Sequence, residues 1–514
     1  MIRDRLPLRL PPADAVRAAL DRRFGIDARA LAAFRIALGL TLLFDALHRS
    51  RNLVAFYTDR GVLPRDLHAT RSWTADYSLH MLSGEPWAQA LLFACTAVLA
   101  VAVIVGYRSR FALLLSLVLV VSVQFRNPLV LNGADRLFRE MLVLALFLPL
   151  GSRWGIDACG RGRESGDTAS RDEHSGPDGT DGLVPDTLIA TPATAAALVY
   201  AVTLFANNAS LKHEGDTWMT GEALLYALRQ DHMTILVGNH LANYPPLLEV
   251  GGYVWFWLLT ASPLLLVVAG WARLLYAGVF LATVAGMSVS VAVGLFPALL
   301  ATLLLSFLPT PVWDGLERGG GAVLERLGVR DGLRRAVRRI DAPPRLRSRL
   351  PDSARRTWAE LRSVVLGAVL IFVVLWSIGM LGYVDTFEPV DSLDPRDHQW
   401  GMFAPDPSTS YGWYTVAAET GEGRKDVLQD AELQSGTPPD ASETLPDFRW
   451  RRYMNSLSES DERADRFAEY MCSRADAQFD ADVERIDVTY THHPIELEGE
   501  ASTSEYDIAE ASCT

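Results

Sequence analysis

Lys212 is the residue whose type is most unusual for its position in this chain. Of the 48 basic residues, 46 are arginines, and Lys212 is the one lysine in the hydrophobic part of the sequence. Arginine keeps its proton in proteins, whereas a buried lysine can become a neutral amine. The lysine therefore predicts either a general base or an interfacial side chain whose stem lies along apolar surface while its charge reaches water.

The sequence around Lys212 contains other groups suited to a polar site. The stretch ASLKHEGDTWMTGEALLYAL, residues 209–228, follows an apolar run and contains a Gly-Asp turn and Trp218. Glu222 stands near the expected start of a short helix, where an acidic side chain is favourable. His213 is either a hydrogen-bond partner within the site or a surface residue, and the sequence leaves both interpretations open.

Several other ionisable residues fall within or beside apolar segments. Arg35 and Asp45 are ten residues apart in one segment, about 15 Å along a helix, so each needs a partner elsewhere. Asp135 and Arg139 belong to NGADRLFRE, residues 132–140. Because charges in a membrane are costly, they predict an ion-pair network that holds helices together, the polar wall of a cavity, or both.

Two clusters near the C-terminal part complete the candidates. HQWGMFAPDP, residues 398–407, places Trp400 and Phe403 where they would either anchor the chain at the membrane interface or cover an outer cavity. RWRRY, residues 449–453, is a basic cluster in an acidic region and predicts internal salt bridges.

Standard metal and nucleotide sites are not predicted. The histidines lack metal-ligand spacing, and the four cysteines are isolated in sequence and too few for a disulfide framework. The sequence also lacks a phosphate loop, a GxGxxG between strand and helix, and a GxSxG. We therefore expect neither a metal cofactor nor nucleotide-driven transport or serine hydrolysis.

The elements that must position these residues are apolar helices. A mean hydropathy of +0.13 combined with a net charge of −13 requires hydrophobic and charged residues to be segregated along the chain. The apolar runs predict an all-α polytopic membrane domain with about nine transmembrane helices, each close to the roughly 20 residues that cross a bilayer. The nine are Leu31–His48, Ala88–Tyr107, Phe111–Phe125, Leu137–Leu150, Thr194–Ala206, Val250–Gly270, Ala272–Val293, Leu295–Leu308 and Val364–Tyr383.

The arginine distribution predicts the orientation. The N-terminal segment, residues 1–30, is arginine-rich, and residues 310–362 hold 13 arginines against seven acidic residues. Positive loops face the cytoplasm, so both should lie there, as should the polar loop at 158–186, which we expect to be disordered. A multi-pass protein of the cell membrane, with a cytoplasmic N-terminus and an extracytoplasmic C-terminus, follows from nine crossings.

The C-terminal part differs from the membrane domain, 31–384, in composition. Residues 385–514 contain 30 acidic and 10 basic residues, and their alternating runs with one helical stretch predict a small α+β soluble domain. So acidic an exterior argues against nucleic acid as a partner and suggests the hypothesis of a halophilic, high-salt habitat. The lipid bilayer is the partner that the sequence itself predicts.

Taken together, six motifs resemble one membrane-protein family. They are FRIALGLTLLFDAL, FYTDRGVLPR, NGADRLFRE with LFLPLGSRWGIDA, SLKHEGDTWMTGEALLYAL, GLFPALLATLLLSFLP and QWGMFAPDP, spread over about residues 25–455. The chain resembles the HTTM domain family, the membrane relatives of vitamin K-dependent gamma-glutamyl carboxylase. The resemblance implies a reduced quinone of the menaquinol type as cofactor and a protein or peptide glutamate as substrate.

The resemblance also implies roles for particular residues. Lys212 matches the family's base and His213 lies beside it as a second catalytic candidate. The quinone pocket would be formed by Arg35, Asp59, Asn132, Asp135, Arg139, Trp218 and Trp400. A histidine expected in the seventh span is missing from TVAGMSVSVAVGLFP, residues 283–297. The leading expectation is a quinone-dependent carboxylase or oxygenase, and the alternative is a non-catalytic membrane scaffold or small-molecule carrier.

Overall fold

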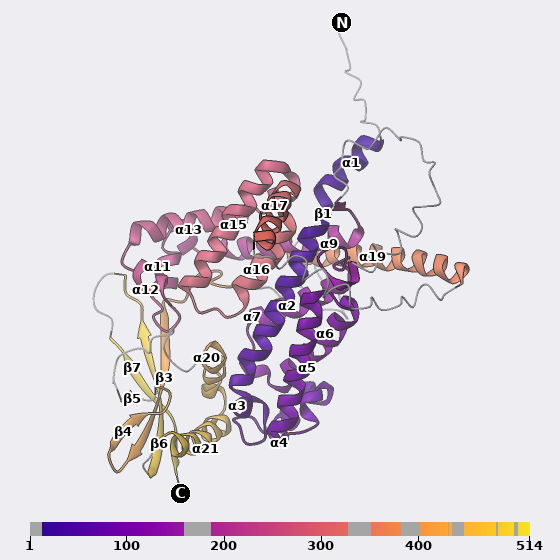
Figure 1. The fold of residues 1–514 in the computed structure, drawn as a ribbon. Helices are drawn as coiled ribbons and strands as arrows, with labels where there is room; N and C mark the ends of the chain where they lie inside the picture. Colours follow the sequence, from indigo (N-terminus) through magenta and orange to yellow (C-terminus); the bar gives the residue numbers. More distant parts are fainter. Residues whose placement is uncertain are drawn as a thin grey trace.

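The computed structural model describes residues 13–158, 187–326, 351–381, 401–429, 431–433, 447–479, 482–497 and 502–513. Most of these residues are helical, and a small sheet lies near the C-terminus. Figure 1 shows α2 (Ala28–Arg51), α5 (Pro86–Val105) and α6 (Ser109–Arg126) running together. The helices α13 (Pro245–Thr260), α15 (Gly270–Ser290) and α19 (Asp352–Met380) run at a steep angle to them, and the sheet lies at the end of the molecule away from the N-terminus.

The first group of helices begins with α1 (Ala13–Phe24) and the long α2 (Ala28–Arg51), which Asp27 caps through its side chain. The helix α5 (Pro86–Val105) is capped by Gly106, whose φ of +70° is a left-handed conformation that favours glycine. Short elements between α2 and α5 form one end of this group. They are α3 (Leu53–Tyr57), α4 (Arg65–Arg71), η1 (Trp73–Tyr77) and η2 (Leu79–Met81), followed by α5 (Pro86–Val105), α6 (Ser109–Arg126), η3 (Pro128–Val130) and α7 (Gly133–Phe147).

The second group is built around α9 (Pro192–Lys212), which packs against α13 and α19. A capping box at Thr191 and a proline in the first turn explain where α9 begins. The remaining helices are α10 (Thr217–Thr220), α11 (Ala223–Leu228), α12 (Val237–Leu241), α13 (Pro245–Thr260), α14 (Leu264–Val267), α15 (Gly270–Ser290), α16 (Phe296–Leu304), η4 (Leu305–Phe307), α17 (Thr310–Arg326) and α19 (Asp352–Met380). A two-stranded pair, β1 (Ile26–Asp27) and β2 (Leu188–Ile189), joins the starts of α2 and α9.

Each of the nine predicted segments overlaps a helix, but the segment at 250–270 is interrupted after Thr260, and not each helix is long enough to span a membrane. Among the described residues, six helices qualify by length and hydropathy, or seven if the pair bent by 106° at residues 308–309 counts as one span. The six are α2, α5, α6, α9, α15 and α19. The segments at 137–150 and 250–270 fall short because α7 has 15 residues and α13 ends at Thr260. The count of nine crossings therefore stays a prediction.

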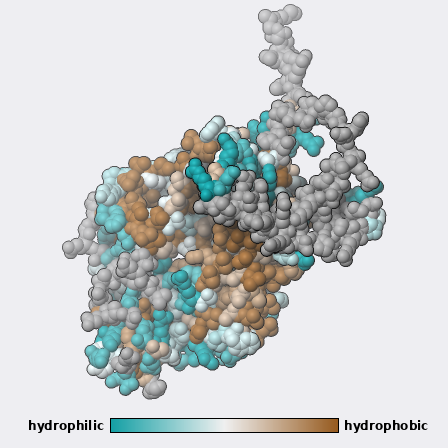
Figure 2. Space-filling model, viewed as in Figure 1, coloured by the Kyte–Doolittle hydropathy of each residue, from teal (hydrophilic) through white to brown (hydrophobic). Residues whose placement is uncertain are grey.

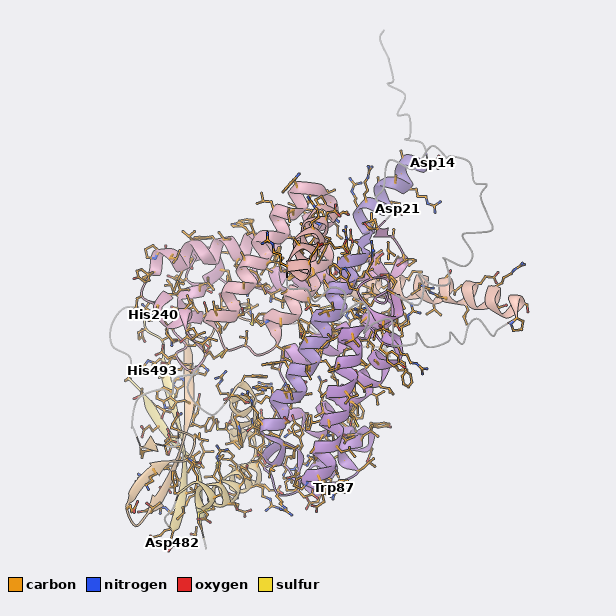
Figure 3. The ribbon with its side chains drawn as sticks, viewed as in Figure 1. Asp14, Asp21, Trp87, His240, Asp482 and His493 are labelled. Atoms are coloured by element: carbon orange, nitrogen blue, oxygen red, sulfur yellow. A yellow bond between two sulfur atoms is a disulfide. The ribbon has the colours of Figure 1, made fainter. Side chains whose placement is uncertain are left out.

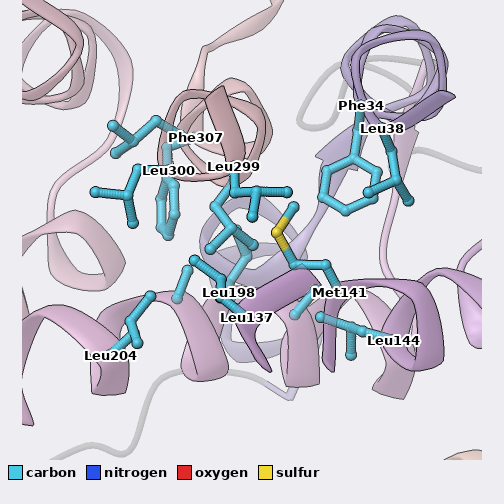
Figure 4. Close-up of a cluster of buried hydrophobic side chains, with 14 of the residues drawn as sticks. Phe34, Leu38, Leu137, Met141, Leu144, Leu198, Leu204, Leu299, Leu300 and Phe307 are labelled. Carbon is cyan, nitrogen blue, oxygen red and sulfur yellow. The ribbon is translucent and has the colours of Figure 1, made fainter. Parts of the chain in front are cut away.

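The surface and the interior both fit a membrane-embedded helical region. Figure 2 shows a hydrophobic band that crosses the molecule diagonally between hydrophilic ends. In Figure 3, Asp14 and Asp21 lie at one of these ends and Asp482 at the other. Beneath the surface, α2, α7, α9 and α16 meet in one core, and Figure 4 shows Leu137 and Met141 beside Leu198 and Leu299. The apolar band is the feature expected of helices surrounded by lipid.

The C-terminal region is a five-stranded antiparallel sheet in the order β5-β4-β3-β6-β7, with α21 packed on it. Predicted strands at 413–419 and 485–493 and a predicted helix at 459–474 correspond to β3, β6 and α21. The elements are β3 (Ser410–Thr420), β4 (Gly423–Asp426), β5 (Ala431–Glu432), α20 (Phe448–Met454), η8 (Leu457–Glu459), α21 (Asp461–Gln478), β6 (Val483–Pro494) and β7 (Ser504–Ser512). This confirms a small α+β arrangement.

Two features of this region were not predicted. Cys472 on α21 and Cys513 beyond β7 form a disulfide. We call β3 to β7 together with α20 and α21 the sheet region. It shares a buried core with the short elements between α2 and α5, where Phe56 packs against Trp450 with ring centroids 4.5 Å apart. The boundary predicted at residue 385, nearly all of the loop predicted at 158–186, and the middle of the arginine-rich 310–362 segment lie outside the described residues.

Candidate functional site

Lys212 is the last residue of α9 and is buried, with 1% of its surface exposed. Its Nζ donates to the backbone carbonyls of Met402 (2.8 Å) and Phe403 (3.0 Å). The same atom lies 3.8 Å from the centroid of the Trp218 ring. Among the described residues, no carboxylate lies within ion-pair distance of this amine. Lys212 is thus held by two backbone oxygens and one aromatic face.

The loop that supplies the two carbonyls is fixed by a second set of contacts. Phe403 adopts a positive φ of 54°, and its carbonyl also accepts the indole N–H of Trp218 at 2.8 Å. Asp406 accepts hydrogen bonds from the backbone N–H and the hydroxyl of Thr217 and from the backbone N–H of Asp216. Burial raises the pKa of Asp406, but these hydrogen bonds outweigh it and hold the pKa below its usual value.

Gly215 is required for this close approach. A Cβ at Gly215 would meet the carbonyl oxygen of Pro405 at 2.4 Å and Oδ1 of Asp406 at 2.6 Å. The Gly-Asp turn predicted after Lys212 therefore allows the backbone of residues 405–406 to lie directly against it. We call residues 401–406 the covering loop, because they lie over the end of α9.

His213 does not share the environment of Lys212. Its Nε2 lies 3.2 Å from the hydroxyl of Thr260, and its ring packs on Phe256 with centroids 4.5 Å apart. His213 caps the end of α9, is exposed, and packs on the surface of α13. Of the two candidate catalytic residues, the structure therefore buries the lysine and leaves the histidine at the surface.

Asn132 and Asp135 lie in a different site, a buried ion cluster. Asn132 caps α7 in a capping box with Asp135. Asp135 and Asp45 both bind Arg49 and Arg449, and all four side chains are at most 4% exposed. The ion-pair interpretation is confirmed for Asp45 and Asp135. Arg449 of RWRRY forms salt bridges as predicted, but the prediction that they are internal to the acidic region is wrong for this residue, because its partners lie on α2 and α7.

Arg35 and Asp59 occupy two further places. The Arg35 guanidinium is buried and donates to the carbonyls of Leu150 (3.1 Å) and Trp154 (2.6 Å), which ties α2 to the chain after α7. Asp59 is 41% exposed and forms an ion pair with Arg65 at 2.8 Å. This hydrogen bond holds the pKa of the Asp59 carboxyl below its usual value. Neither contact involves Lys212.

Arg139 lines a cavity of about 480 Å³ between α7, α9 and α19. Thr203 of α9 lines this cavity, and Lys212 is nine residues further along the same helix, about half a turn around its axis. The cavity and Lys212 therefore face different sides of α9. Trp400, the last of the predicted pocket residues, lies outside the described residues. Trp218 is the pocket residue that the structure places against Lys212.

The sequence did not predict the oxygen atoms that bind Lys212. Both are backbone carbonyls, which have no signature in residue type. Asp406 belongs to the QWGMFAPDP motif, and its position between two prolines was the available signal for a loop anchor. A second polar pocket of about 420 Å³, between His232 and the sheet residues Tyr411, Tyr414 and Tyr490, was also missed.

Fold and site together define a mostly helical chain with candidate membrane spans and a buried lysine where the covering loop meets the end of α9. No family model matches the chain, and no curated protein and no solved structure matches it either.

Proposed function

We propose that this chain is a membrane enzyme of the HTTM type that acts with a reduced quinone and uses Lys212 as its general base. The observation that carries the proposal is the environment of Nζ, which has two backbone carbonyls and an indole ring as neighbours. A lysine ion-paired with a carboxylate would be held in its protonated form. Lys212 has no such partner among the described residues, so burial can favour the neutral amine that a base requires.

The number of hydrogen atoms on the amine supports the same role. A neutral lysine retains two N–H groups and an ammonium has three. The carbonyls of Met402 and Phe403 accept two of them, so both hydrogen bonds survive when the third proton leaves. Lys212 can therefore accept and release one proton at Nζ while its position stays fixed, which is the property expected of a positioned base.

Trp218 is the side chain that could hold the polar head of a quinone beside the amine, because its ring centroid lies 3.8 Å from Nζ of Lys212. A reduced quinone would supply the electrons for reaction with O₂. Asn207, five residues earlier on α9, is 1% exposed, and its side-chain nitrogen and oxygen lack hydrogen-bond partners among the described residues. Five residues turn an α-helix by about 140°, so this amide faces away from Lys212 and is not part of its site.

The test compares Lys212→Met with Thr217→Val. Both variants remove a donor to the covering loop, but only Lys212→Met removes the base. We expect O₂-dependent conversion of menaquinol to its epoxide to fall by a factor of about 10² or more in Lys212→Met. Thr217→Val should keep most of the activity. Equal losses in the two variants, or no conversion by the wild type, would refute the proposed chemistry.

The contacts of Lys212 also favour a second function, a non-catalytic scaffold or carrier in which the amine only latches the covering loop. Arginine can donate to two carbonyls and stack on an indole, but it cannot act as a base. Lys212→Arg should therefore be tolerated in the scaffold and should abolish epoxide formation in the enzyme. Thermal unfolding of Lys212→Arg, measured beside activity, distinguishes loss of the base from loss of the fold.

For the location, we propose a multi-pass protein of the cell membrane with about nine crossings and an extracytoplasmic sheet region. The disulfide between Cys472 and Cys513 supports this orientation, because disulfides persist in oxidising compartments. After reduction, an impermeant maleimide should label these cysteines in intact spheroplasts. Labelling that requires lysis would place the sheet region in the cytoplasm.

A further inference from the structure

The cavity of about 480 Å³ between α7, α9 and α19 has a polar end and an apolar end. The polar end is formed by Arg136, Arg139, Glu140 and Tyr200. The rest is lined mainly by apolar side chains of α7 and α19, namely Val143, Leu144, Phe147, Val369, Phe372 and Val373. This volume lies in the range of pockets that bind small molecules.

The charges at the polar end do not balance. Glu140 accepts a hydrogen bond from Nε of Arg136 at 2.8 Å and another from the Tyr200 hydroxyl at 2.5 Å. Its charge is therefore matched by Arg136. Arg139 is partly buried and has no hydrogen-bond or ion-pair partner among the described residues. Glu140 and Asp135 act on it only at longer range, and both already bind other arginines. A cation that faces an apolar cavity without a partner is costly, and an anion bound there would relieve the cost.

The apolar end continues from Arg139 along one side of α7. From Arg139 to Phe147 the helix rises by about 12 Å, and Phe372 and Val373 of α19 face the same space. An anion alone would leave this surface unfilled, whereas an amphiphile with an acidic head and a hydrocarbon tail would satisfy both ends. We propose that the cavity binds one anionic phospholipid, with its phosphate on Arg139 and an acyl chain between α7 and α19.

The uncompensated charge decides between related amphiphiles. An uncharged quinone would fill the apolar end but leave Arg139 without an anion. A zwitterionic phospholipid would bring a second cation close to Arg136 and Arg139, whereas an anionic head adds only negative charge. This inference is independent of the role of Lys212, because Lys212 faces a different side of α9.

Native mass spectrometry of the delipidated full chain, titrated with phosphatidylglycerol or with phosphatidylcholine of the same acyl chains, tests the proposal. We expect one phosphatidylglycerol to bind more tightly than phosphatidylcholine. Arg139→Gln should weaken phosphatidylglycerol binding about ten-fold, the effect of losing one charge-assisted hydrogen bond. Arg60→Gln is the matched control, because it removes an exposed arginine whose side chain is 74% accessible.

A second variant tests the tail site without changing any charge. Val143 lines the cavity and is 44% exposed, so Val143→Trp would obstruct the acyl path at little packing cost. We expect this variant to keep its fold by circular dichroism and to lose phosphatidylglycerol binding. Equal affinity of wild type and Arg139→Gln for phosphatidylglycerol, equal binding of both lipids by the wild type, or binding unaffected by Val143→Trp would each overturn the proposal.

Discussion

The sheet region and its covering loop contact the helices at two buried cationic sites with opposite chemistry. At the ion cluster, Arg449 of α20 enters between Asp45 and Asp135, and a second arginine, Arg49, balances the charge. At the covering loop, Lys212 of α9 meets backbone carbonyls and an indole ring. The first site fixes two positive and two negative charges, and the second contains an amine with no carboxylate at ion-pair distance among the described residues, since Asp406 acts on it only at longer range.

This difference indicates which site is structural and which can do chemistry. A buried cluster of matched charges resists any change of protonation, because each change leaves an unpaired charge in a medium of low dielectric constant. A lysine held by neutral oxygens can change its protonation without breaking an ion pair. We infer that the ion cluster holds the sheet region in place and that the covering loop positions the amine on which the proposed function rests.

The largest effect should come from breaking the ion cluster with Arg449→Met. This change leaves two carboxylates with one arginine in a buried site, which should cost about 3–5 kcal/mol of unfolding free energy. Equilibrium unfolding of the full chain in mixed micelles would measure it. Arg452→Met, at an exposed position on the same helix, is the control and should change stability by less than about 1 kcal/mol.

A double variant separates charge balance from packing in this cluster. Asp45→Asn removes one negative charge, so combining it with Arg449→Met leaves Arg49 and Asp135 as a matched pair. The double variant should therefore be more stable than Arg449→Met alone. Additive destabilisation by the two substitutions would show that lost packing, rather than unpaired charge, dominates.

A smaller effect is expected at the covering loop. Lys212→Met leaves the Met402 carbonyl without its donor, while the Phe403 carbonyl keeps the indole N–H of Trp218. One unsatisfied buried carbonyl should cost about 1–3 kcal/mol. Hydrogen exchange of residues 401–409 should become faster in this variant, with little change in α20. Unchanged exchange would mean that the amine does not hold the loop.

The contrast between the two sites also shows what could be predicted from the sequence. Asp45 and Asp135 were predicted to need charged partners, because isolated charges in apolar segments are costly. Their partner Arg449 lies 404 residues beyond Asp45, and no local pattern indicates such a contact. The rarity of lysine indicated Lys212, yet the atoms around it are backbone oxygens of a distant loop, which residue types do not reveal.

The fold shows the same limit. Apolar runs predicted where helices occur, and alternating residues predicted β3 and β6, because these patterns are local. Helix lengths were less predictable. The segment at 250–270 is continuous in hydropathy, but the structure ends α13 at Thr260 and starts α15 at Gly270, with Pro263 between them. The disulfide joins residues 41 positions apart, so spacing alone did not pair Cys472 with Cys513.

A pH-dependent effect on stability is expected at a third contact between the helices and the sheet region, where His232 stacks on Tyr411 of β3 with ring centroids 5.2 Å apart. Burial, with a smaller contribution from Arg451, lowers the pKa of His232 from 6.5 to about 4. The unfolded chain therefore binds a proton between pH 6.5 and 4 that the folded chain does not. Stability should fall as the pH falls through this window, by up to about 2 kcal/mol at pH 5.

His232→Phe keeps an aromatic ring on Tyr411 but cannot be protonated. The loss of stability between pH 7 and pH 5 should therefore be smaller in this variant by up to about 2 kcal/mol. Thermal unfolding of both proteins at the two pH values measures the difference. His80, which burial also gives a pKa of about 4, remains in both proteins and contributes equally. An unchanged pH dependence would assign the acid sensitivity to other groups.

The smallest effect should come from salt, and it distinguishes exposed from buried charge. Residues 385–514 carry 30 acidic and 10 basic side chains. Many of the described ion pairs there are exposed, such as Arg466 with Glu469. Molar salt screens repulsion between exposed carboxylates but acts weakly on buried groups. Raising NaCl from 0.1 to 1 M should therefore stabilise the full chain by no more than about 1 kcal/mol, the scale of exposed charge interactions.

The cost of Arg449→Met should be nearly the same at both salt concentrations, because its partners are buried. If that cost instead shrank with salt, water and ions would reach Asp45 and Asp135, and the ion cluster would resemble an exposed network rather than the fixed counterpart of the Lys212 site.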